Sequence, residues 1–249
     1  MDWVRDFYSK QTLWLGLEER WARISVDDLQ GRPVNRAAAI ERFAGSGAKR
    51  VLELGCGSGI VAGAMVSAGH TVVAVDLIDE RVANAQRIAG QFPQGKLEVV
   101  QGDFYEIELT DLFDVVCYFD GFGIGSDADQ RRLLERIAAW LQTDGCALVD
   151  VYSPFAERTG EVVEDFEALS RTTFDAEGCR LVNSIWPKDG DESEAVAQSL
   201  RCYSVLDFQL LLEGTGLSLE AVEPYRSADH DVVVPMGEAM LYLSKLIPT

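Results

Sequence analysis

Three acidic residues in the first half of the chain follow or end short apolar stretches, where each could bind a polar ligand. Glu53 lies in "VLELGCGSG" (51–59) just before three glycines, Asp76 ends "VVAVD", and Asp103 ends "VVQGD". Carboxylates accept hydrogen bonds and pair with cations. A glycine-rich turn between a strand and a helix lets a ligand contact the backbone and presents helix N-terminal amides to it. These residues predict a site for a small ligand that carries both cationic and hydroxyl groups.

The spacing of the glycines argues against two common nucleotide sites. The dinucleotide fingerprint needs a third glycine three positions after the second, where this chain has Ile60, and the phosphate-binding loop needs a lysine that "GSGIVAG" lacks. Glu53 would repel a pyrophosphate, whereas it suits an ammonium group and a sulfonium. Asp76 can accept hydrogen bonds from both hydroxyls of a ribose, and Asp103 can accept one from the amino group of adenine. S-adenosylmethionine carries all of these groups.

At these positions the chain resembles the class I S-adenosylmethionine-dependent methyltransferases. The motifs that carry the resemblance are "VLELGCGSG", "VVAVD", "VVQGDF" and "FDVVCYFD", which lie within residues 48–151, and residues 204–246 match the family's usual sheet ending. The resemblance implies S-adenosyl-L-methionine as cofactor and S-adenosyl-L-homocysteine as product. It also implies the cofactor-binding residues, which are Glu53, Gly55, Gly57, Gly59, Asp76, Leu77, Asp103 and Phe104.

Aromatic residues near these motifs extend the predicted cofactor site. The segment "DWVRDFYSKQTLWLG" places Phe7 and Trp14 on one helical face with Tyr8 beside them, so we expect this helix to close over the pocket mouth. A tyrosine hydroxyl there would meet the carboxylate end of the cofactor. Phe119, which follows the fourth predicted strand, is also expected at the cofactor.

Three further residues are expected at the methyl acceptor. Ligands of open α/β sheets bind at the carboxyl ends of the strands, which places Asp120 of "YFDGFG" and Tyr152 of "VYSPF" beside the reactive methyl group. His230 lies in a polar loop between the last two predicted strands, where it is expected to reach over the pocket as a base. The family's enzymes that methylate nucleic-acid bases or glutamine carry two prolines after the fourth strand. "YFDGFG" lacks them, which argues against those acceptors.

The elements that must position these residues alternate along the chain. Short continuous apolar runs such as "RVLEL" and "TVVAVD" are separated by helical patterns such as "DADQRRLLERIAAWL", which indicates a parallel sheet covered on both faces. We therefore predict an α/β fold. The resemblance implies a Rossmann-like sheet of seven strands in the order 3-2-1-4-5-7-6, with the last strand antiparallel and a small antiparallel β insertion.

A single domain is predicted for residues 1–249. Its parts are a helical N-terminal lid (1–45), a cofactor-binding core (46–154), a β insertion that covers the substrate (155–203), and a C-terminal helix with two strands (204–249). The insertion is predicted to hold two antiparallel strands, "RTTFDAEGCRLVNSIWP" and "EAVAQSLRCYS", joined by the polar turn "KDGDESE".

Composition limits the partners. The net charge of −19 disfavours nucleic acid and anionic membranes, and no stretch approaches the length of a membrane span, so we expect a cytoplasmic protein with a small-molecule substrate. The five cysteines are odd in number and dispersed, and there are only two histidines, so neither disulfides nor a metal site is predicted. The oligomeric state stays open.

The predicted function is methyl transfer from S-adenosylmethionine to an oxygen or nitrogen of a small, apolar or aromatic metabolite, of the kind that enzymes tailoring natural products modify. Three alternatives remain. The chain could bind S-adenosylmethionine without transferring its methyl group, could methylate a macromolecule, or could be a nicotinamide-dependent oxidoreductase.

Overall fold

The computed structural model describes residues 2–155 and 160–249. Residue 1 of the expected N-terminal lid and residues 156–159 of the expected insertion lie outside this part of the chain.

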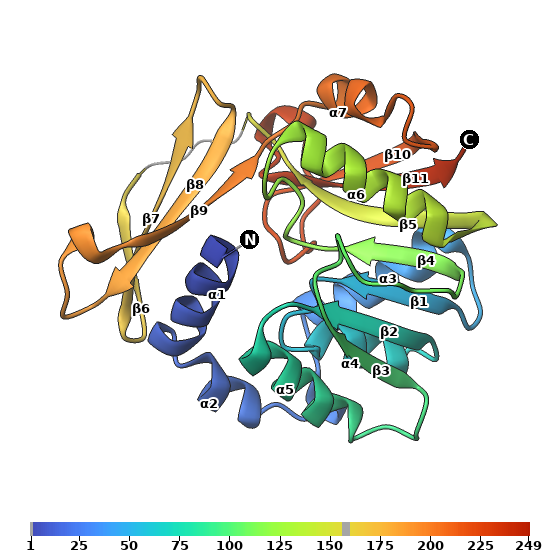
Figure 1. The fold of residues 1–249 in the computed structure, drawn as a ribbon, viewed down its shortest axis with the longest axis horizontal. Helices are drawn as coiled ribbons and strands as arrows, with labels where there is room; N and C mark the ends of the chain where they lie inside the picture. Colours follow the sequence, from blue (N-terminus) through green and yellow to red (C-terminus); the bar gives the residue numbers. More distant parts are fainter. Residues whose placement is uncertain (1, 156–159) are drawn as a thin grey trace.

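A seven-stranded sheet forms the centre of the molecule (Figure 1). Its strands are β1 (Arg50–Leu54), β2 (Thr71–Asp76), β3 (Leu97–Gln101), β4 (Phe113–Tyr118), β5 (Leu141–Tyr152), β10 (Leu217–Tyr225) and β11 (Leu241–Pro248). They lie in the order β10-β11-β5-β4-β1-β2-β3, and β11 pairs antiparallel with both of its neighbours. This order and the antiparallel last strand are those that the family resemblance implies.

Helices cover both faces of this sheet because the central strands are apolar on both sides. The helices α3 (Arg32–Ala44), α4 (Ile60–Ser67) and α5 (Asp79–Ala89) pack on one face, where buried residues such as Ile40, Met65 and Ile88 meet Val51. The helices α6 (Asp127–Trp140) and α7 (Val205–Leu212) cover the other face. The α3 helix has Pro33 in its first turn, where the missing proline N–H costs no helical hydrogen bond.

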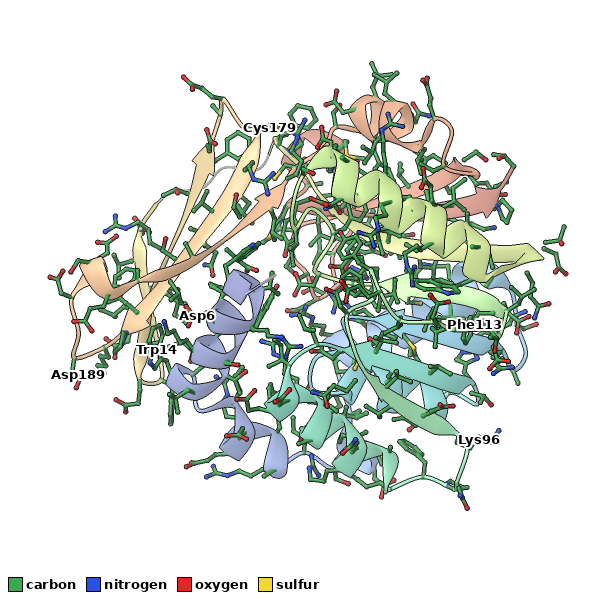
Figure 2. All side chains as sticks on the ribbon, viewed as in Figure 1. Asp6, Trp14, Lys96, Phe113, Cys179 and Asp189 are labelled. Carbon is green, nitrogen blue, oxygen red and sulfur yellow. The ribbon has the colours of Figure 1, made fainter. Side chains whose placement is uncertain are left out.

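The carboxyl ends of the parallel strands point toward the N-terminal helices. Lys96 and Phe113, at the amino ends of β3 and β4, lie on the right of Figure 2, whereas Asp6 and Trp14 of α1 (Asp2–Trp14) lie on the left. A second short helix, α2 (Leu17–Ala22), and a 3-10 turn, η1 (Val26–Asp28), lead from α1 to α3. The expected helical start of the chain is therefore present.

A second, antiparallel sheet stands beside the first, with α1 between them (Figure 1). It contains β6 (Val162–Asp165), β7 (Ala168–Asp175), β8 (Arg180–Pro187) and β9 (Val196–Arg201), and a 3-10 turn, η2 (Glu192–Glu194), joins β8 to β9. Phe7 of α1 is buried against Ala168 and Ile185 of this sheet. A last 3-10 turn, η3 (Met236–Glu238), precedes β11.

The expectation of two strands in the insertion is wrong, because the second sheet has four. The stretch "RTTFDAEGCRLVNSIWP", read as one strand, contains β7, a turn and β8. Asp175 makes this turn, since its carboxylate accepts hydrogen bonds from the backbone N–H groups of Glu177 and Gly178, both at 3.1 Å. The sequence "DAEG" carries the turn signal that separates the two strands.

Candidate active site

A cavity of about 470 Å³ opens at the carboxyl ends of β1, β2 and β4, beside α1 and the start of α3. It lies where the strand order reverses between β4 and β1, the position at which open α/β sheets bind ligands. Eleven of the predicted site residues line it: Tyr8, Glu53, Gly55, Gly57, Asp76, Leu77, Asp103, Phe104, Phe119, Asp120 and Tyr152. Gly59 and His230 are not among the lining residues.

The three glycines of the loop after β1 have positive φ angles but different surroundings. A Cβ atom on Gly57 would meet only the Arg81 side chain at 3.8 Å, so the space above Gly57 is open. A Cβ atom on Gly59 would lie 2.7 Å from the Cα and Cβ atoms of Ala85. Gly57 therefore gives a ligand access to the backbone, whereas Gly59 allows the loop and α5 to pack closely.

Asp76, at the end of β2, binds the glycine loop. Its Oδ2 accepts a hydrogen bond from the Gly57 N–H at 2.7 Å, and its Oδ1 accepts one from the Ile78 N–H at 2.9 Å. Each carboxylate oxygen has a second lone pair, so both can still accept a hydrogen bond from a ligand. These two backbone hydrogen bonds therefore fix the orientation of the Asp76 carboxylate, with a free lone pair on each oxygen for a ligand hydroxyl.

Glu53 and Arg36 lie on the cavity wall with unsatisfied polar atoms. The Oε2 atom of Glu53 and the Nε atom of Arg36 are buried and have no hydrogen-bond partner. Burial raises the pKa of Glu53 to about 8, although the positive charge of Arg36 opposes this. Buried polar atoms usually have partners, so an unsatisfied acceptor and an unsatisfied donor on one cavity wall suit a ligand with a cation and an anion close together.

Another part of the cavity wall comes from the turn after β3. Asp103 accepts a hydrogen bond from the Tyr105 N–H at 2.9 Å, which shapes the turn and leaves Phe104 against the Tyr118 ring, with 5.3 Å between ring centroids. Leu77, directly after Asp76, also lines the cavity. This part of the wall offers an apolar surface with one carboxylate.

Tyr8 of α1 contacts both the second sheet and α5. Its hydroxyl donates a hydrogen bond to Oε1 of Gln198 in β9 at 2.8 Å, and the Arg81 guanidinium lies 4.4 Å from its ring centroid. Burial raises the pKa of Tyr8 above its ordinary value, so the hydroxyl stays protonated at neutral pH. Helix α1 therefore contacts both α5 and the second sheet above the cavity.

Asp120 carries a second charge at the cavity, in the loop after β4. Its carboxylate accepts hydrogen bonds from the Tyr152 hydroxyl and from the Arg32 guanidinium. Burial alone would raise the Asp120 pKa, but Arg32, Arg36 and the Tyr152 hydroxyl together hold this pKa below its usual value. Asp120 is thus an ionised carboxylate at neutral pH, and it has a positive φ of 60°.

His230 does not reach the cavity, contrary to the expectation of a loop histidine over the pocket. It is buried, its ring stacks on Tyr225 at 4.3 Å, and its Nε2 lies 2.8 Å from Oδ1 of Asp150. The described lining residues include no histidine. The acids next to His230 in the sequence do not indicate this burial. The buried ring instead contacts Asp150, which is far away in the sequence.

Most of the other residues that line the cavity were not predicted. The unpredicted residues at or behind it include Arg32, Arg36, Asp150 and Gln198. Asp150 had a sequence signal, because it is the one acid in the apolar run "CALVDVY" and a buried charge needs partners. The two arginines lie on a helix whose periodicity indicates only an amphipathic face. Gln198 lies on β9 of the second sheet and lines the cavity. No sequence motif indicates where this sheet packs.

Neither a metal-ligand cluster nor a membrane-spanning helix occurs among the residues that the structure describes. In the described part of the chain, no three or more His, Cys, Asp or Glu side chains are arranged to hold a metal ion. No helix within residues 2–155 and 160–249 has both the length and the apolar character needed to cross a membrane.

Comparison with known proteins identifies the fold. Residues 51–145 match the family model described as "Methyltransferase domain". A protein of Geobacillus sp. (strain WCH70) named as a methyltransferase is 33% identical over 118 residues, so the alignment spans only 47% of each chain. The CcbJ methyltransferase of Streptomyces caelestis matches with a TM-score of 0.71 at 21% identity, over 90% of this chain and 94% of that chain. The glycopeptide N-methyltransferase MtfA, in complex with S-adenosylmethionine, matches with a TM-score of 0.63 at 18% identity, over 89% and 96%.

Proposed function

We propose a methyltransferase activity for this chain from its family: residues 51–145 belong to the methyltransferase domain family, and the fold is that of the class I S-adenosylmethionine-dependent methyltransferases. The proposed reaction transfers a methyl group from S-adenosylmethionine to a nitrogen of a small-molecule acceptor. The bound cofactor supplies a methyl group that its sulfonium already activates, so the protein needs mainly to align the acceptor and exclude water.

Three residues that line the cavity have an unsatisfied buried atom, namely Glu53, Arg36 and Arg81, and the first two carry the cofactor assignment. Glu53 Oε2 would accept a hydrogen bond from the ammonium group of the cofactor's amino-acid end, and Arg36 Nε would donate one to its carboxylate. Asp76 would accept from the two ribose hydroxyls, while Asp103, Phe104 and Leu77 would hold the adenine. The donors and acceptors on the wall thus fit the polar groups of S-adenosylmethionine.

The acid in the loop after β4 supports nitrogen over oxygen as the acceptor atom. Amine nitrogen becomes positively charged when it takes a methyl group, and the ionised Asp120 would stabilise that charge as it forms. A hydroxyl acceptor must lose its proton to a base, and Asp120, with its lowered pKa, is a poor base. Two solved proteins of this fold, MtfA and KedS8, are named as N-methyltransferases.

Labelled methyl transfer tests the proposed acceptor. The purified chain is incubated with S-adenosylmethionine that carries a trideuterated methyl group and with a panel of amino sugars, peptide amines, aromatic amines and phenols. Mass spectrometry should find the label on an amine and on no phenol. Label on phenols alone would contradict nitrogen transfer, and no label on any member of the panel would favour cofactor binding without transfer or a macromolecular acceptor.

A further inference from the structure

Asp150 is a fully buried charge near the carboxyl end of β5 (Leu141–Tyr152) that no part of the proposed reaction explains. Its side chain is 0% exposed, and it is flanked by apolar residues in "CALVDVY". A carboxylate in such a place is stable only when charged or hydrogen-bonding groups surround it. In this structure it has three such partners, and they come from three different segments of the chain.

Two of these partners belong to the cavity wall. Asp150 Oδ2 accepts a hydrogen bond from Nη2 of Arg36 at 3.0 Å and another from the backbone N–H of Asp120 at 3.2 Å. Arg36 is the residue whose Nε is free for the cofactor carboxylate, and Asp120 is the acid placed at the acceptor. One oxygen atom therefore binds a residue of each half of the site.

The third partner is His230, which contacts Asp150 and not the cavity. Because a carboxylate only accepts hydrogen bonds, Nε2 of His230 carries the proton and donates to Oδ1 at 2.8 Å. Stacking on Tyr225 holds the ring on one side, and the Phe119 ring meets it edge-on at 6.1 Å. Asn35 of α3 donates a hydrogen bond to the backbone carbonyl of Asp229 at 3.1 Å, which fixes the loop that carries His230.

The backbone at both ends of this chain of contacts is unusual. Asp120 and His230 have φ angles of 60° and 54°, which residues other than glycine rarely adopt. Such conformations persist where the surroundings hold them. For Asp120 the hydrogen bond from its N–H to Asp150 is one such restraint, and His230 fixes the carboxylate that accepts it.

We propose that Asp150, held by His230, is a positioning residue that sets Arg36 at the cofactor and Asp120 at the acceptor from a single carboxylate. This inference rests on the proposed function for the roles of Arg36 and Asp120. His230 thereby acts through Asp150 and touches neither ligand.

Two amide variants of His230 separate positioning from general stability. His230→Gln keeps a donor long enough to reach Asp150, whereas His230→Asn is one methylene shorter and loses that reach. Asparagine also tolerates positive φ, so His230→Asn is expected to fold. The matched control is His70→Gln, because His70 is the other histidine of the chain, is buried, and bonds Lys49 N–H at 3.2 Å away from the cavity. If His230→Asn does not fold, His230→Met, which keeps the length and removes the donor, replaces it.

The first readout needs no ligand. Amide hydrogen exchange, followed by NMR, should be about fivefold or more faster at Asp120 in His230→Asn than in the wild type, and near wild-type in His230→Gln and His70→Gln. Unchanged exchange at Asp120 in His230→Asn, or equally fast exchange in His70→Gln, would overturn the proposal.

The second readout is calorimetric affinity for S-adenosylhomocysteine. His230→Asn should bind it about fivefold more weakly than the wild type, while His230→Gln and His70→Gln should stay within about twofold. Equal affinity in all four proteins would contradict the claim that His230 and Asp150 position Arg36 at the cofactor. A wild-type protein that binds no S-adenosylhomocysteine would instead contradict the proposed function, and the exchange measurement would still decide whether Asp150 and His230 position Asp120.

Discussion

Asp76 Oδ2 lies 2.7 Å from the backbone nitrogen of Gly57, so the acid that ends β2 also holds the glycine loop that follows β1. The same carboxylate accepts the Ile78 N–H through its other oxygen. One residue thus shapes the loop and presents two lone pairs to the cavity. Its loss would change both the loop and the ribose contacts proposed above.

Asp76→Ala should therefore weaken S-adenosylhomocysteine binding at least about tenfold, because charge-assisted hydrogen bonds contribute about 1.5–3 kcal/mol each. Asp76→Asn, which keeps one oxygen, should lose less. Calorimetry on both variants checks this, with Asp111→Ala as a control, since Asp111 is exposed and outside the cavity. Wild-type affinity in folded Asp76→Ala would remove Asp76 from the site.

The glycines should separate binding from stability. Gly57→Val places a branched side chain in the space above the loop, so it should abolish cofactor binding. Its φ of 55° strains the valine backbone and should lower the melting temperature, but without the steric clash that a side chain meets at Gly59. Gly59→Ala puts a methyl group against Ala85 at 2.7 Å, so it should destabilise the fold by about 1 kcal/mol or more. Calorimetric titration and thermal melts of the two variants measure the contrast. The assignment fails if Gly57→Val binds normally.

Glu53 should make cofactor binding depend on pH. Its pKa of about 8 leaves it protonated at neutral pH, and an ammonium group next to it would favour the ionised form. Binding of S-adenosylhomocysteine at pH 7 should therefore release close to one proton. Calorimetry in buffers of different ionisation enthalpy measures this number, which should fall to zero in Glu53→Gln. Proton uptake, or release that persists in Glu53→Gln, would contradict the assignment.

The same residue should affect stability in the absence of ligand. Burial raises the Glu53 pKa above its ordinary value of 4.5, so the folded protein binds this proton more tightly than the unfolded chain does. The stabilising contribution is present below about pH 4.5 and is lost as the pH rises toward 8. Glu53→Gln should therefore melt at a higher temperature than the wild type at pH 7 and show no such gain at pH 4. A lower melting temperature at pH 7 would show that Glu53 is paired when the ligand is absent.

Tyr8→Phe tests whether α1 closes over the cofactor. The change removes the hydrogen bond to Gln198 without changing the ring that lies under Arg81, and should weaken S-adenosylhomocysteine binding about fivefold, the value of one neutral hydrogen bond of about 1 kcal/mol. Hydrogen exchange in α1 should slow when the ligand is added. Gln11→Ala, which removes the contact of Gln11 with Arg81, is a companion variant in the same helix. The lid assignment is wrong if ligand leaves the exchange of α1 unchanged.

Removal of the whole N-terminal segment is a poorer test than the sequence suggests. Phe7 is 1% exposed and completes a small core with Ala168 and Ile185 of the second sheet. Truncation would expose that core, so loss of binding would not distinguish a lid from a structural helix.

Asp120 should raise the affinity for a ligand that carries a positive charge at the position of the transferred methyl group. Sinefungin resembles the cofactor but has a carbon in place of the sulfur and an amine in place of the methyl group, so an ionised Asp120 should favour it over S-adenosylhomocysteine. Asp120→Asn should reduce the affinity for sinefungin about tenfold and that for S-adenosylhomocysteine about twofold or less. Equal losses for both ligands would mean that Asp120 does not face the methyl group.

Local sequence signals predicted the elements of the core and the residues at the strand ends. Continuous apolar runs identified β1, β2 and β4, and acids directly after strands had to meet at one edge of a parallel sheet, which brought Asp76, Asp103 and Asp120 to one cavity. These inferences succeeded because chain direction and strand order alone set the position of a strand's carboxyl end.

Contacts between distant segments could not be predicted in this way. The burial of His230 depends on Asp150, 80 positions away in the sequence, and the role of Gln198 at the cavity depends on how the second sheet packs on α1. Neither pairing has a fixed spacing or motif. The wrong strand count of the second sheet has a local cause. The prediction runs one strand through the Asp175 turn, which separates β7 from β8.

Calorimetric titration of the wild-type chain with S-adenosylhomocysteine, with NADH in a parallel titration, tests the central claim most directly. The cavity with Glu53, Arg36 and Asp76 on its wall predicts one molecule of S-adenosylhomocysteine bound per chain with micromolar affinity, roughly −8 kcal/mol, and no saturable heat with NADH. Binding of NADH together with no binding of S-adenosylhomocysteine would contradict the assignment of this cavity to S-adenosylmethionine.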